Sequence, residues 1–395
     1  MEDTYRRGLE WNIRAYYFFR ALQKRAYLPL IAVYAVSVAG LNLAEFGLVA
    51  SVTAAVALIL EVPSGYMADR IGHKKALIIG NAISALSPLG YIFLPDFWGV
   101  LIGSAGYFGG YAFISGTQEA FMHETLLELG REGEYGKLMG RTQTAGLLGN
   151  VVLVALVPLV YPIDPRLPFL IGAILMAVAL AIAYTLTVPR RTHQPAAELD
   201  EVSFWRLFRR MRDNRQQLLF LVLGMAAAAG YKISEFREIY FQALDIPIIY
   251  LGLILAASSL CAAAVSFNIH KLEFLSPNRY YAGSFIYLFA VTIAAGLVAS
   301  PGLGIALLIL VVIYNRNEHT LTHAYLLRDC PTQELKATYI SMYAFAKALS
   351  GVWIPLLLGY LAASFGIQAG FAVFGVIMLV LVSIVFALYL KIRRG

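Results

Sequence analysis

The segment GYMADRIGHKK, residues 65–75, carries five charged or titratable side chains within seven positions. It lies between two apolar stretches, LVASVTAAVALILEVPS before it and ALIIGNAISALSPLGYIFLP after it. Two glycines, Gly65 and Gly72, flank the Asp69–Arg70 pair, and His73, Lys74 and Lys75 follow the second glycine. Such an interruption is either a solvated loop or a working part of the molecule, and the surrounding sequence has to decide between the two.

The composition indicates a membrane protein. Of 395 residues, 59% are hydrophobic and 14% are charged, whereas soluble domains have about 45–50% apolar and about 25% charged residues. The formal charge of +7 does not indicate nucleic-acid binding, because the basic residues lie in short connections between apolar stretches. Cys261 and Cys330 form neither a disulfide framework nor a metal-ligand spacing, and we expect no cofactor.

Twelve stretches are long and apolar enough to cross a bilayer, which takes about 20 residues each. They lie near 26–41, 45–67, 75–94, 97–125, 138–161, 167–188, 218–241, 248–270, 279–299, 302–327, 337–364 and 368–391. A polar segment separates the first six from the last six. The sequence therefore predicts an all-α polytopic membrane protein with an N-terminal six-helix bundle (1–188), a cytoplasmic linker (189–217) and a C-terminal six-helix bundle (218–395).

The distribution of Lys and Arg predicts the orientation. With both termini inside, the cytoplasmic segments hold 26 of the 31 basic residues and the external loops hold only Arg166. This asymmetry is the one that the positive-inside rule describes. Residues 1–25 are interpreted as a cytoplasmic lead-in whose basic and aromatic end anchors the first span at the lipid headgroups.

The two halves resemble each other weakly. Span 4 reads FISGTQEAFMHETLLELG from Phe113, and span 10 reads IYNRNEHTLTHAYLLRDC from Ile313. At an offset of 200 residues His123 coincides with His323, and Glu119 with His319. Together with the division into six and six, this similarity predicts two bundles related by a pseudo-two-fold axis along the membrane normal.

In this loop of a twelve-span chain, residues 65–74 resemble the G-x-L-a-D-r-x-G-r-k pattern of the major facilitator superfamily. Met67 and His73 replace the usual Leu and Arg, and the rest of the pattern is met. The resemblance implies a secondary transporter that works by alternating access, and a loop that latches the cytoplasmic side shut. Span 5 lacks the G-P-x-x-G-G of drug antiporters, so the resemblance does not extend to a subfamily.

The residues of the predicted latch have distinct physical roles. Gly65 would permit close helix packing, Gly72 a turn with positive φ, and Asp69 an interaction with the positive end of a helix. The remaining members are Arg70, which could pair with a carboxylate, Lys74, and Glu61 one turn above the motif.

Ionisable residues within a span are expensive in lipid and are candidates for function. In span 7, Lys232, Glu235 and Glu238 recur at three-residue spacing and so share a helix face, while Arg237 points elsewhere. Two interpretations stay open here. Lys232 and Glu235 form a buried ion pair that packs helices, or this face binds substrate or protons.

Spans 4 and 10 carry further candidates. Glu119 and His123 lie four residues apart, and a carboxylate next to an imidazole suits proton relay. The candidates of span 10 are Arg316, Glu318, His319 and His323, and span 1 offers the aromatic Tyr34. The same imidazoles and carboxylates could instead bind a divalent transition metal.

The sequence thus predicts a secondary active transporter that exports a small amphipathic or lipophilic compound by proton coupling. Its expected partners are that solute, protons and the bilayer, and no nucleic acid. We expect a monomer in a bacterial or archaeal plasma membrane. The alternatives are a transition-metal or organic-ion transporter that uses spans 4 and 10, and a transport-dead sensor or intramembrane enzyme.

Overall fold

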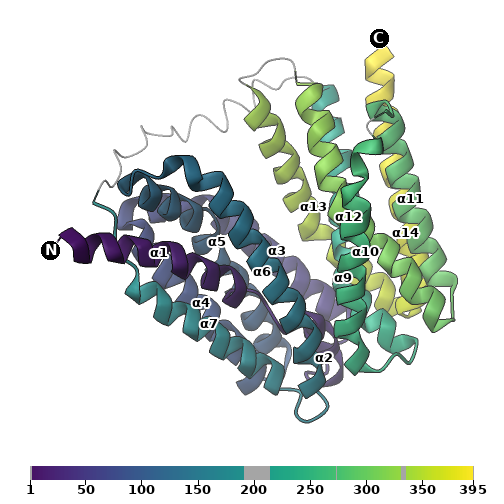
Figure 1. The fold of residues 1–395 in the computed structure, drawn as a ribbon. Coiled ribbons are helices and arrows are strands. Elements are labelled where there is room, and N and C mark those ends of the chain that lie inside the picture. Colours follow the sequence, from purple (N-terminus) through teal and green to yellow (C-terminus); the bar gives the residue numbers. More distant parts are fainter. Residues whose placement is uncertain (1, 191–213, 273, 331–334, 395) are drawn as a thin grey trace. The chain divides into compact units, whose positions relative to one another are not determined.

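A computed structural model describes residues 2–190, 214–272, 274–330 and 335–394, and within these ranges the regular structure is entirely helical (Figure 1). Most of the predicted linker, residues 191–213, lies outside the described residues. The chain divides into two compact units. Unit 1 consists of Met1–Gly40 and Ala55–Glu198, and unit 2 of Leu41–Ala54 and Leu199–Gly395.

Ten helices of the described chain precede the linker: α1 (Glu2–Leu22), η1 (Leu28–Leu30), α2 (Ile31–Ser37), α3 (Leu43–Ile71), α4 (His73–Phe93), α5 (Phe97–Glu128), η2 (Glu132–Glu134), α6 (Tyr135–Leu156), η3 (Val157–Val160) and α7 (Leu167–Thr185). The first part of α3 belongs to unit 2. Those after it are α9 (Asn214–Ala243), η4 (Ile248–Tyr250), α10 (Leu251–Phe267), η5 (Ile269–Leu272), α11 (Pro277–Leu297), α12 (Pro301–Arg328), α13 (Lys336–Phe365) and α14 (Ile367–Arg394).

The predicted twelve-helix architecture is confirmed. By length and composition, ten stretches of the described helices could cross a membrane. The two remaining crossings have polar or broken sequences. The first consists of α1 followed by the short apolar stretch Leu28–Ser37, and the tenth is α12, which contains the polar run NRNEH at residues 315–319.

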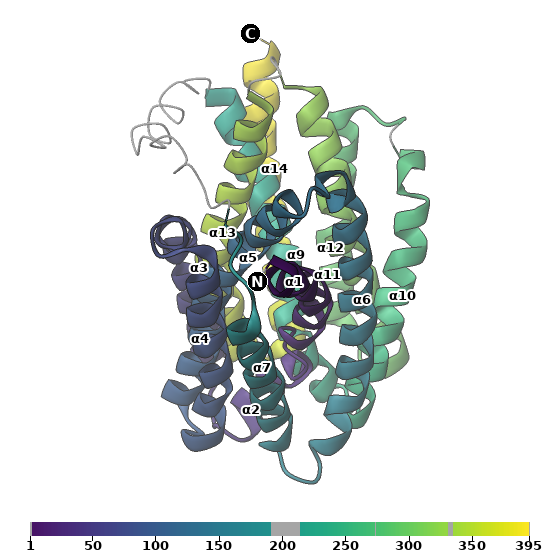
Figure 2. The same ribbon diagram turned by 60° about the vertical axis from the view of Figure 1, so that its left-hand side comes forward.

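The start of the chain differs from the prediction. Residues 2–22 are not a lead-in but a helix, α1, that packs against α6 and α7, and Figure 2 shows it nearly end-on. Asn12 is fully buried in it and donates to Thr125 Oγ1 and to the carbonyl of Thr187. The basic turn at residues 20–25 follows this packed helix, and Lys24 and Arg25 within it are half-buried.

The predicted cytoplasmic connections of unit 1 meet at one end of the unit. Arg131, between α5 and α6, forms an ion pair with Glu10 of α1, and the Lys74 ammonium donates to the carbonyl of Tyr184 at the end of α7. Arg131 also binds Glu134 and lowers the pKa of that exposed carboxyl. These contacts tie the beginning of α1 and three connections together.

Close packing of α4 on α5 holds the middle of unit 1 together. A Cβ atom on Gly80 would lie 2.7 Å from the carbonyl oxygen of Gly110, and one on Gly110 would lie 2.6 Å from that of Gly80. Glycine at both positions lets the two backbones approach, as small residues do between membrane helices. The result is a rigid α4–α5 pair, and α5 carries several of the candidate residues.

This packing predicts opposite effects for two glycines of α5. Gly110→Ala should destabilise the protein by about 1–3 kcal/mol through overpacking. Gly116→Ala is the matched control, because a Cβ there meets no described atom within 4 Å and alanine favours a helix over glycine. The measurement is thermal unfolding of both variants in detergent. Equal melting temperatures for the two variants would contradict the packing argument.

Candidate transport site

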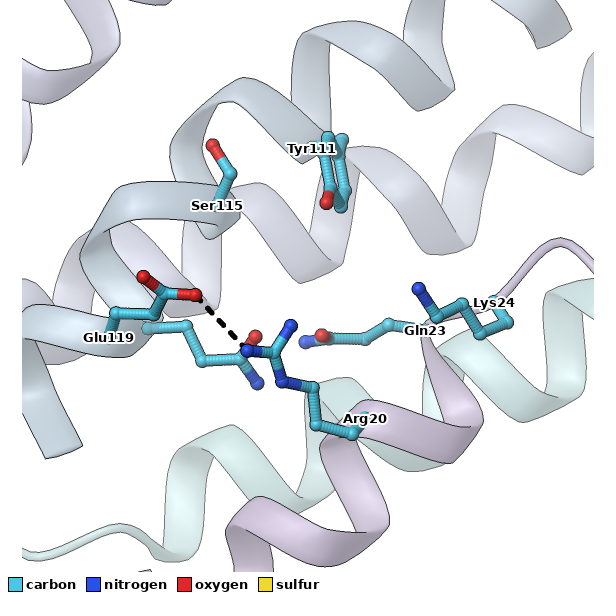
Figure 3. Close-up of a pocket in the computed structure, with 7 residues that line it drawn as sticks. Arg20, Gln23, Lys24, Tyr111, Ser115 and Glu119 are labelled. Carbon is cyan, nitrogen blue, oxygen red and sulfur yellow. Dashed lines mark hydrogen bonds and ion pairs between the residues drawn. The ribbon is translucent and has the colours of Figure 1, made fainter. Parts of the chain in front are cut away.

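A polar cavity of about 70 Å³ lies inside unit 1, between the break in the first crossing and the middle of α5 (Figure 3). Its lining is formed by Arg20, Gln23, Lys24, Tyr111, Ser115, Gln118 and Glu119. Figure 3 shows the first three of these on one side of the cavity, with Tyr111, Ser115 and Glu119 on the other.

The local sequence explains both sides of the cavity. Arg20 lies in the last turn of α1, where a positive charge suits the negative end of the helix dipole. The helix ends at Leu22, and the Gln23 amide is then held by a 3.0 Å hydrogen bond to Asn81 of α4. On α5, Tyr111, Ser115 and Glu119 recur every four residues and so share one helix face, and Gln118 lies three residues after Ser115.

An ion pair spans the cavity. Arg20 Nη2 lies 3.1 Å from Glu119 Oε1, and the Arg20 guanidinium also stacks over the Tyr16 ring at 5.4 Å. The Arg20 side chain is 19% exposed and that of Glu119 is 52% exposed. The carboxylate side chain is thus half exposed, while its cationic partner is largely buried.

Two buried donors of the cavity find no acceptor among the described residues. They are Arg20 Nε and Gln118 Nε2, and the Gln118 side chain belongs to a residue that is only 5% exposed. Leaving a buried donor unpaired costs roughly 1–3 kcal/mol. Both nitrogens are enclosed by protein, so neither faces the open space of the cavity in this conformation.

Several predicted partners of unit 1 are separated. His123 is exposed and lies edge-on to the Tyr135 ring at 5.5 Å, so Glu119 contacts Arg20 and not the imidazole. Tyr34 is fully buried, donates to the carbonyl of Tyr91 and packs against Phe169. Tyr34, a candidate of span 1, is thus a packing aromatic whose hydroxyl is used inside the helix packing.

The ionisable residues of span 7 form two pairs in unit 2. Lys232 Nζ lies 2.9 Å from Glu235 Oε2, which confirms the predicted contact. Glu238, in contrast, pairs with Arg237, and both residues are buried. The expectation that Arg237 points away from the other charges is therefore wrong, because its long side chain turns back to the neighbouring carboxylate.

Polar residues of α12 face α9 and α13 within the same unit. The Asn315 amide donates to Ser234 Oγ and to the carbonyl of Gly230, both on α9. Glu318 is buried and accepts a 2.7 Å hydrogen bond from the Tyr343 hydroxyl of α13.

The two histidines of α12 lie on one helix face, as predicted. The ring centroids of His319 and His323 are 3.8 Å apart, and His323 also lies edge-on to Tyr343. Arg316 is exposed. Nowhere in the described part of the chain do three His, Cys, Asp or Glu side chains gather as a metal site requires. The geometry thus gives no support to the predicted metal-binding alternative.

The loop between α3 and α4 is shaped partly as predicted. Gly72 has φ +91° and allows the sharp turn into α4. A Cβ atom on Gly65, however, would meet no described atom within 4 Å, so this glycine brings no helices together within its unit. Asp69 lies 3.6 Å from His73, the first residue of α4, and His73 lies 3.0 Å from the buried Glu124 of α5.

The other members of the predicted latch have local contacts. Arg70 stacks over the Tyr66 ring at 4.5 Å, where a carboxylate partner was expected. The Lys74 ammonium caps the end of α7, and Glu61 is exposed on α3. A second cavity, of about 190 Å³, lies beside this loop and is lined by residues of the motif together with Phe121, Glu124 and Val188.

Comparison with known proteins identifies the family. The Major Facilitator Superfamily model matches residues 15–317. The chain belongs to the Major Facilitator Superfamily. It is 24% identical to the raffinose permease of Escherichia coli over 98% of this chain and 93% of the permease. It is 23% identical to YxaM of Bacillus subtilis, an uncharacterized MFS-type transporter, over 92% and 93% of the two chains.

Solved structures agree with this assignment of the fold. A mutant form of the nucleoside transporter NupG has a TM-score of 0.81 at 14% identity, and the match covers 97% of this chain and 99% of NupG. A bacterial homologue of the lysosomal transporter Spinster has a TM-score of 0.71 at 15% identity over 99% and 97%. The protein is thus an integral membrane transporter of this superfamily and not an enzyme.

The sequence prediction missed four residues that line the cavity of this superfamily transporter: Arg20, Gln23, Lys24 and Gln118. The sequence nevertheless contained a signal for this site. Basic residues at positions 20, 24 and 25 stand directly before an apolar segment that contains Pro29, and a polar or proline-containing interruption of a span can mark a binding site. The composition of residues 1–25 concealed it, because basic and aromatic residues are also typical of a headgroup anchor.

The Lys232–Glu235 pair allows a direct choice between its two interpretations. If the pair only packs helices, Glu235→Gln should lower the melting temperature by several degrees, since it leaves a buried ammonium unpaired. The double variant Lys232→Met/Glu235→Leu should recover most of this loss and keep transport. Recovered stability without transport would assign the pair to the transport cycle instead.

Proposed function

We propose that this transporter couples the movement of a small polar solute to protons, with Glu119 as the proton-binding group. The observation that carries the proposal is the Arg20–Glu119 ion pair across the cavity. Half of the carboxylate side chain is exposed, whereas its cationic partner is largely buried.

Protonation of Glu119 changes the energetics of the cavity. The neutral acid no longer balances the charge of Arg20, and an uncompensated guanidinium inside a membrane-spanning bundle is unfavourable. The protein can relieve this imbalance by binding a ligand or by rearranging its helices. Proton binding and solute binding are thereby linked through one cation, which is the requirement for coupled transport.

The lining of the cavity supports a polar cargo. All seven lining residues carry a hydrogen-bonding group, and a polar solute can exchange hydrogen bonds with such a lining whereas a lipophilic one cannot. The raffinose permease and the nucleoside transporter NupG are named for hydrophilic solutes. We therefore replace the lipophilic cargo of the sequence prediction with a polar one.

The arrangement of unit 1 supports the proposed orientation. The beginning of α1, the α3–α4 and α5–α6 connections and the end of α7 meet at one end of the unit, and this end is rich in Lys and Arg. The positive-inside rule assigns it to the cytoplasm of a bacterial plasma membrane. In this orientation Asp69 and Arg70 remain candidates for a cytoplasmic latch, and His73 joins them through its contacts with Asp69 and Glu124. We retain the monomeric state.

Transport by Glu119→Gln tests the coupling. Purified protein in liposomes is assayed with radiolabelled sugars, nucleosides and carboxylates, under a proton gradient of either direction and in solute exchange without a gradient. We expect Glu119→Gln to lose at least 90% of gradient-driven flux but to retain exchange, because exchange needs no net proton movement. The control Glu132→Gln removes an exposed acid outside the cavity and should behave as wild type.

The same assay determines the direction of transport. An inward proton gradient accumulates the solute in a symporter and expels it in an antiporter. Gradient-driven flux at the wild-type rate in Glu119→Gln would contradict the assignment of the proton site to this residue.

Cysteine labelling tests the orientation. Glu132→Cys, between α5 and α6, and Asp164→Cys, between η3 and α7, are placed separately in a variant whose Cys261 and Cys330 are replaced by serine. A membrane-impermeant maleimide applied to intact cells should label Asp164→Cys at once and Glu132→Cys only after permeabilisation. The reverse pattern would place the termini outside.

A further inference from the structure

Arg316 is a charged residue in the middle of a crossing that has no partner within the described chain. It lies halfway along α12, its side chain is exposed, and it forms neither an ion pair nor a hydrogen bond with any described residue. Lys232 and Arg237, the basic residues within α9, are in contrast each paired with a carboxylate. Charges within spans normally have partners and mark the paths of solutes or ions, so Arg316 is a candidate for contact with a solute.

The neighbours of Arg316 extend its positive charge along one side of α12. Arg316, His319, Thr320 and His323 are spaced three or four residues apart and so share a helix face, on which the first three are exposed and His323 is half-buried. The two imidazole rings have centroids 3.8 Å apart. Lys347 of α13 lies close enough for its charge to act on His323. We call these five residues the basic face of unit 2.

The acids of the surrounding helices are already engaged. The helices α9 to α14 contain three acidic residues, of which Glu235 and Glu238 of α9 are held in the two ion pairs of that helix. The third, Glu318, is buried and accepts the hydrogen bond of the Tyr343 hydroxyl. Being two positions from Arg316, Glu318 lies on another side of α12. The exposed charge of the basic face is therefore positive.

The depth of Arg316 in the crossing indicates what the basic face borders. A guanidinium exposed to lipid tails near the middle of a span is costly, whereas one that faces water is not. The exposed side of α12 therefore borders a water-filled path. Guanidinium and ammonium groups donate hydrogen bonds and accept none, and hydroxyls and neutral imidazoles each have a hydrogen to donate. A cationic surface rich in donors suits anionic oxygen atoms, to which hydrogen bonds are strongest.

We propose that the basic face of unit 2 binds an anionic oxygen group of the transported solute, a carboxylate or a phosphate, with Arg316 as its main contact. The planar guanidinium can donate two parallel hydrogen bonds to either group. Lys347 supplies a second positive charge, and Thr320 a neutral donor. The inference rests on the proposed function, because it names the class of polar solute that the transporter carries.

Thiol labelling tests the charge of the basic face without a known solute. Thr320→Cys is placed in a variant whose Cys261 and Cys330 are replaced by serine. Its labelling rates with an anionic and a cationic methanethiosulfonate are each divided by the rate of that reagent with a free thiol. We expect the anionic reagent to react roughly tenfold faster on this scale, because a positive surface concentrates anions. Adding Arg316→Gln should remove most of the preference. The matched control Arg279→Gln, which removes an exposed cation at the start of α11, should keep it.

Equilibrium binding tests the recognition of the anionic group. The probes are benzoate, lactate and phenyl phosphate, compared with benzamide, lactamide and phenol, and they are added to the purified full-length protein in detergent. We expect at least one anion to bind, and its neutral counterpart to bind roughly tenfold more weakly or less, as the loss of charge-assisted hydrogen bonds predicts. The anion that binds most tightly distinguishes carboxylate from phosphate.

Variants of Arg316 make the binding test specific. Arg316→Gln should lose the discrimination between the anion and its neutral counterpart, and Arg279→Gln should retain it. Arg316→Lys, which keeps the charge but not the planar fork, should retain part of the affinity. The labelling of Thr320→Cys leaves Arg316 in place, so it decides the charge of the face even where Arg316→Gln does not fold.

Several outcomes would overturn the proposal. One is equal relative labelling of Thr320→Cys by the two reagents, and another is no labelling by either. Equal binding of anions and neutral counterparts, or no binding of any anion, would also overturn it. A purely structural role of Arg316 would appear as a lower melting temperature of Arg316→Gln with unchanged discrimination between anion and neutral counterpart.

Failure of this inference is distinguishable from failure of the proposed function. Anion binding that depends on Arg316, without proton-driven flux, would remove the coupling and leave the anion site. Proton-driven flux of neutral solutes, together with equal labelling of Thr320→Cys by both reagents, would leave the coupling and remove the anion site.

Discussion

The constraint on which this structure depends is that a charge inside a membrane-spanning bundle needs a partner. In unit 1 the two partners are Arg20 of α1 and Glu119 of α5, which are 99 residues apart in sequence and 3.1 Å apart in space. Unit 2 meets it with Lys232–Glu235 and Arg237–Glu238. The pair in unit 1 differs because its acid is half exposed and borders a cavity. It is thus the pair to which we assign the coupled proton.

The wall of the cavity on the side of α1 is formed at the end of this helix. Arg20 and Lys24 are four residues apart, a spacing that places side chains on one face of a helix. The helix ends at Leu22, and Gln23 and Lys24, which follow directly, line the same cavity as Arg20. The rigid packing of α4 on α5 at Gly80 and Gly110 then holds the opposite wall.

Features that depend on local pattern could be predicted from the sequence. Most crossings, the positive φ at Gly72 and the Lys232–Glu235 contact follow from hydropathy, glycine preference and helical spacing. Features that arise from tertiary contacts could not be predicted from the sequence. Residues 1–25 have the composition of a headgroup anchor, yet Asn12 is buried by bonds to Thr125 and Thr187. The partner of Glu119 was sought on its own helix at His123, whereas it comes from α1. No periodicity within one helix encodes such a contact.

The most direct test of the account is a count of the protons that move with the solute. Purified protein in weakly buffered liposomes is given the solute that the flux assay identifies, and the solute flux and the pH change are recorded together. If Glu119 binds the coupled proton, wild type should move protons in a fixed ratio to solute, and Glu119→Gln should exchange solute without moving protons. Proton movement by Glu119→Gln at the wild-type ratio, or solute flux through wild type without proton movement, would contradict it.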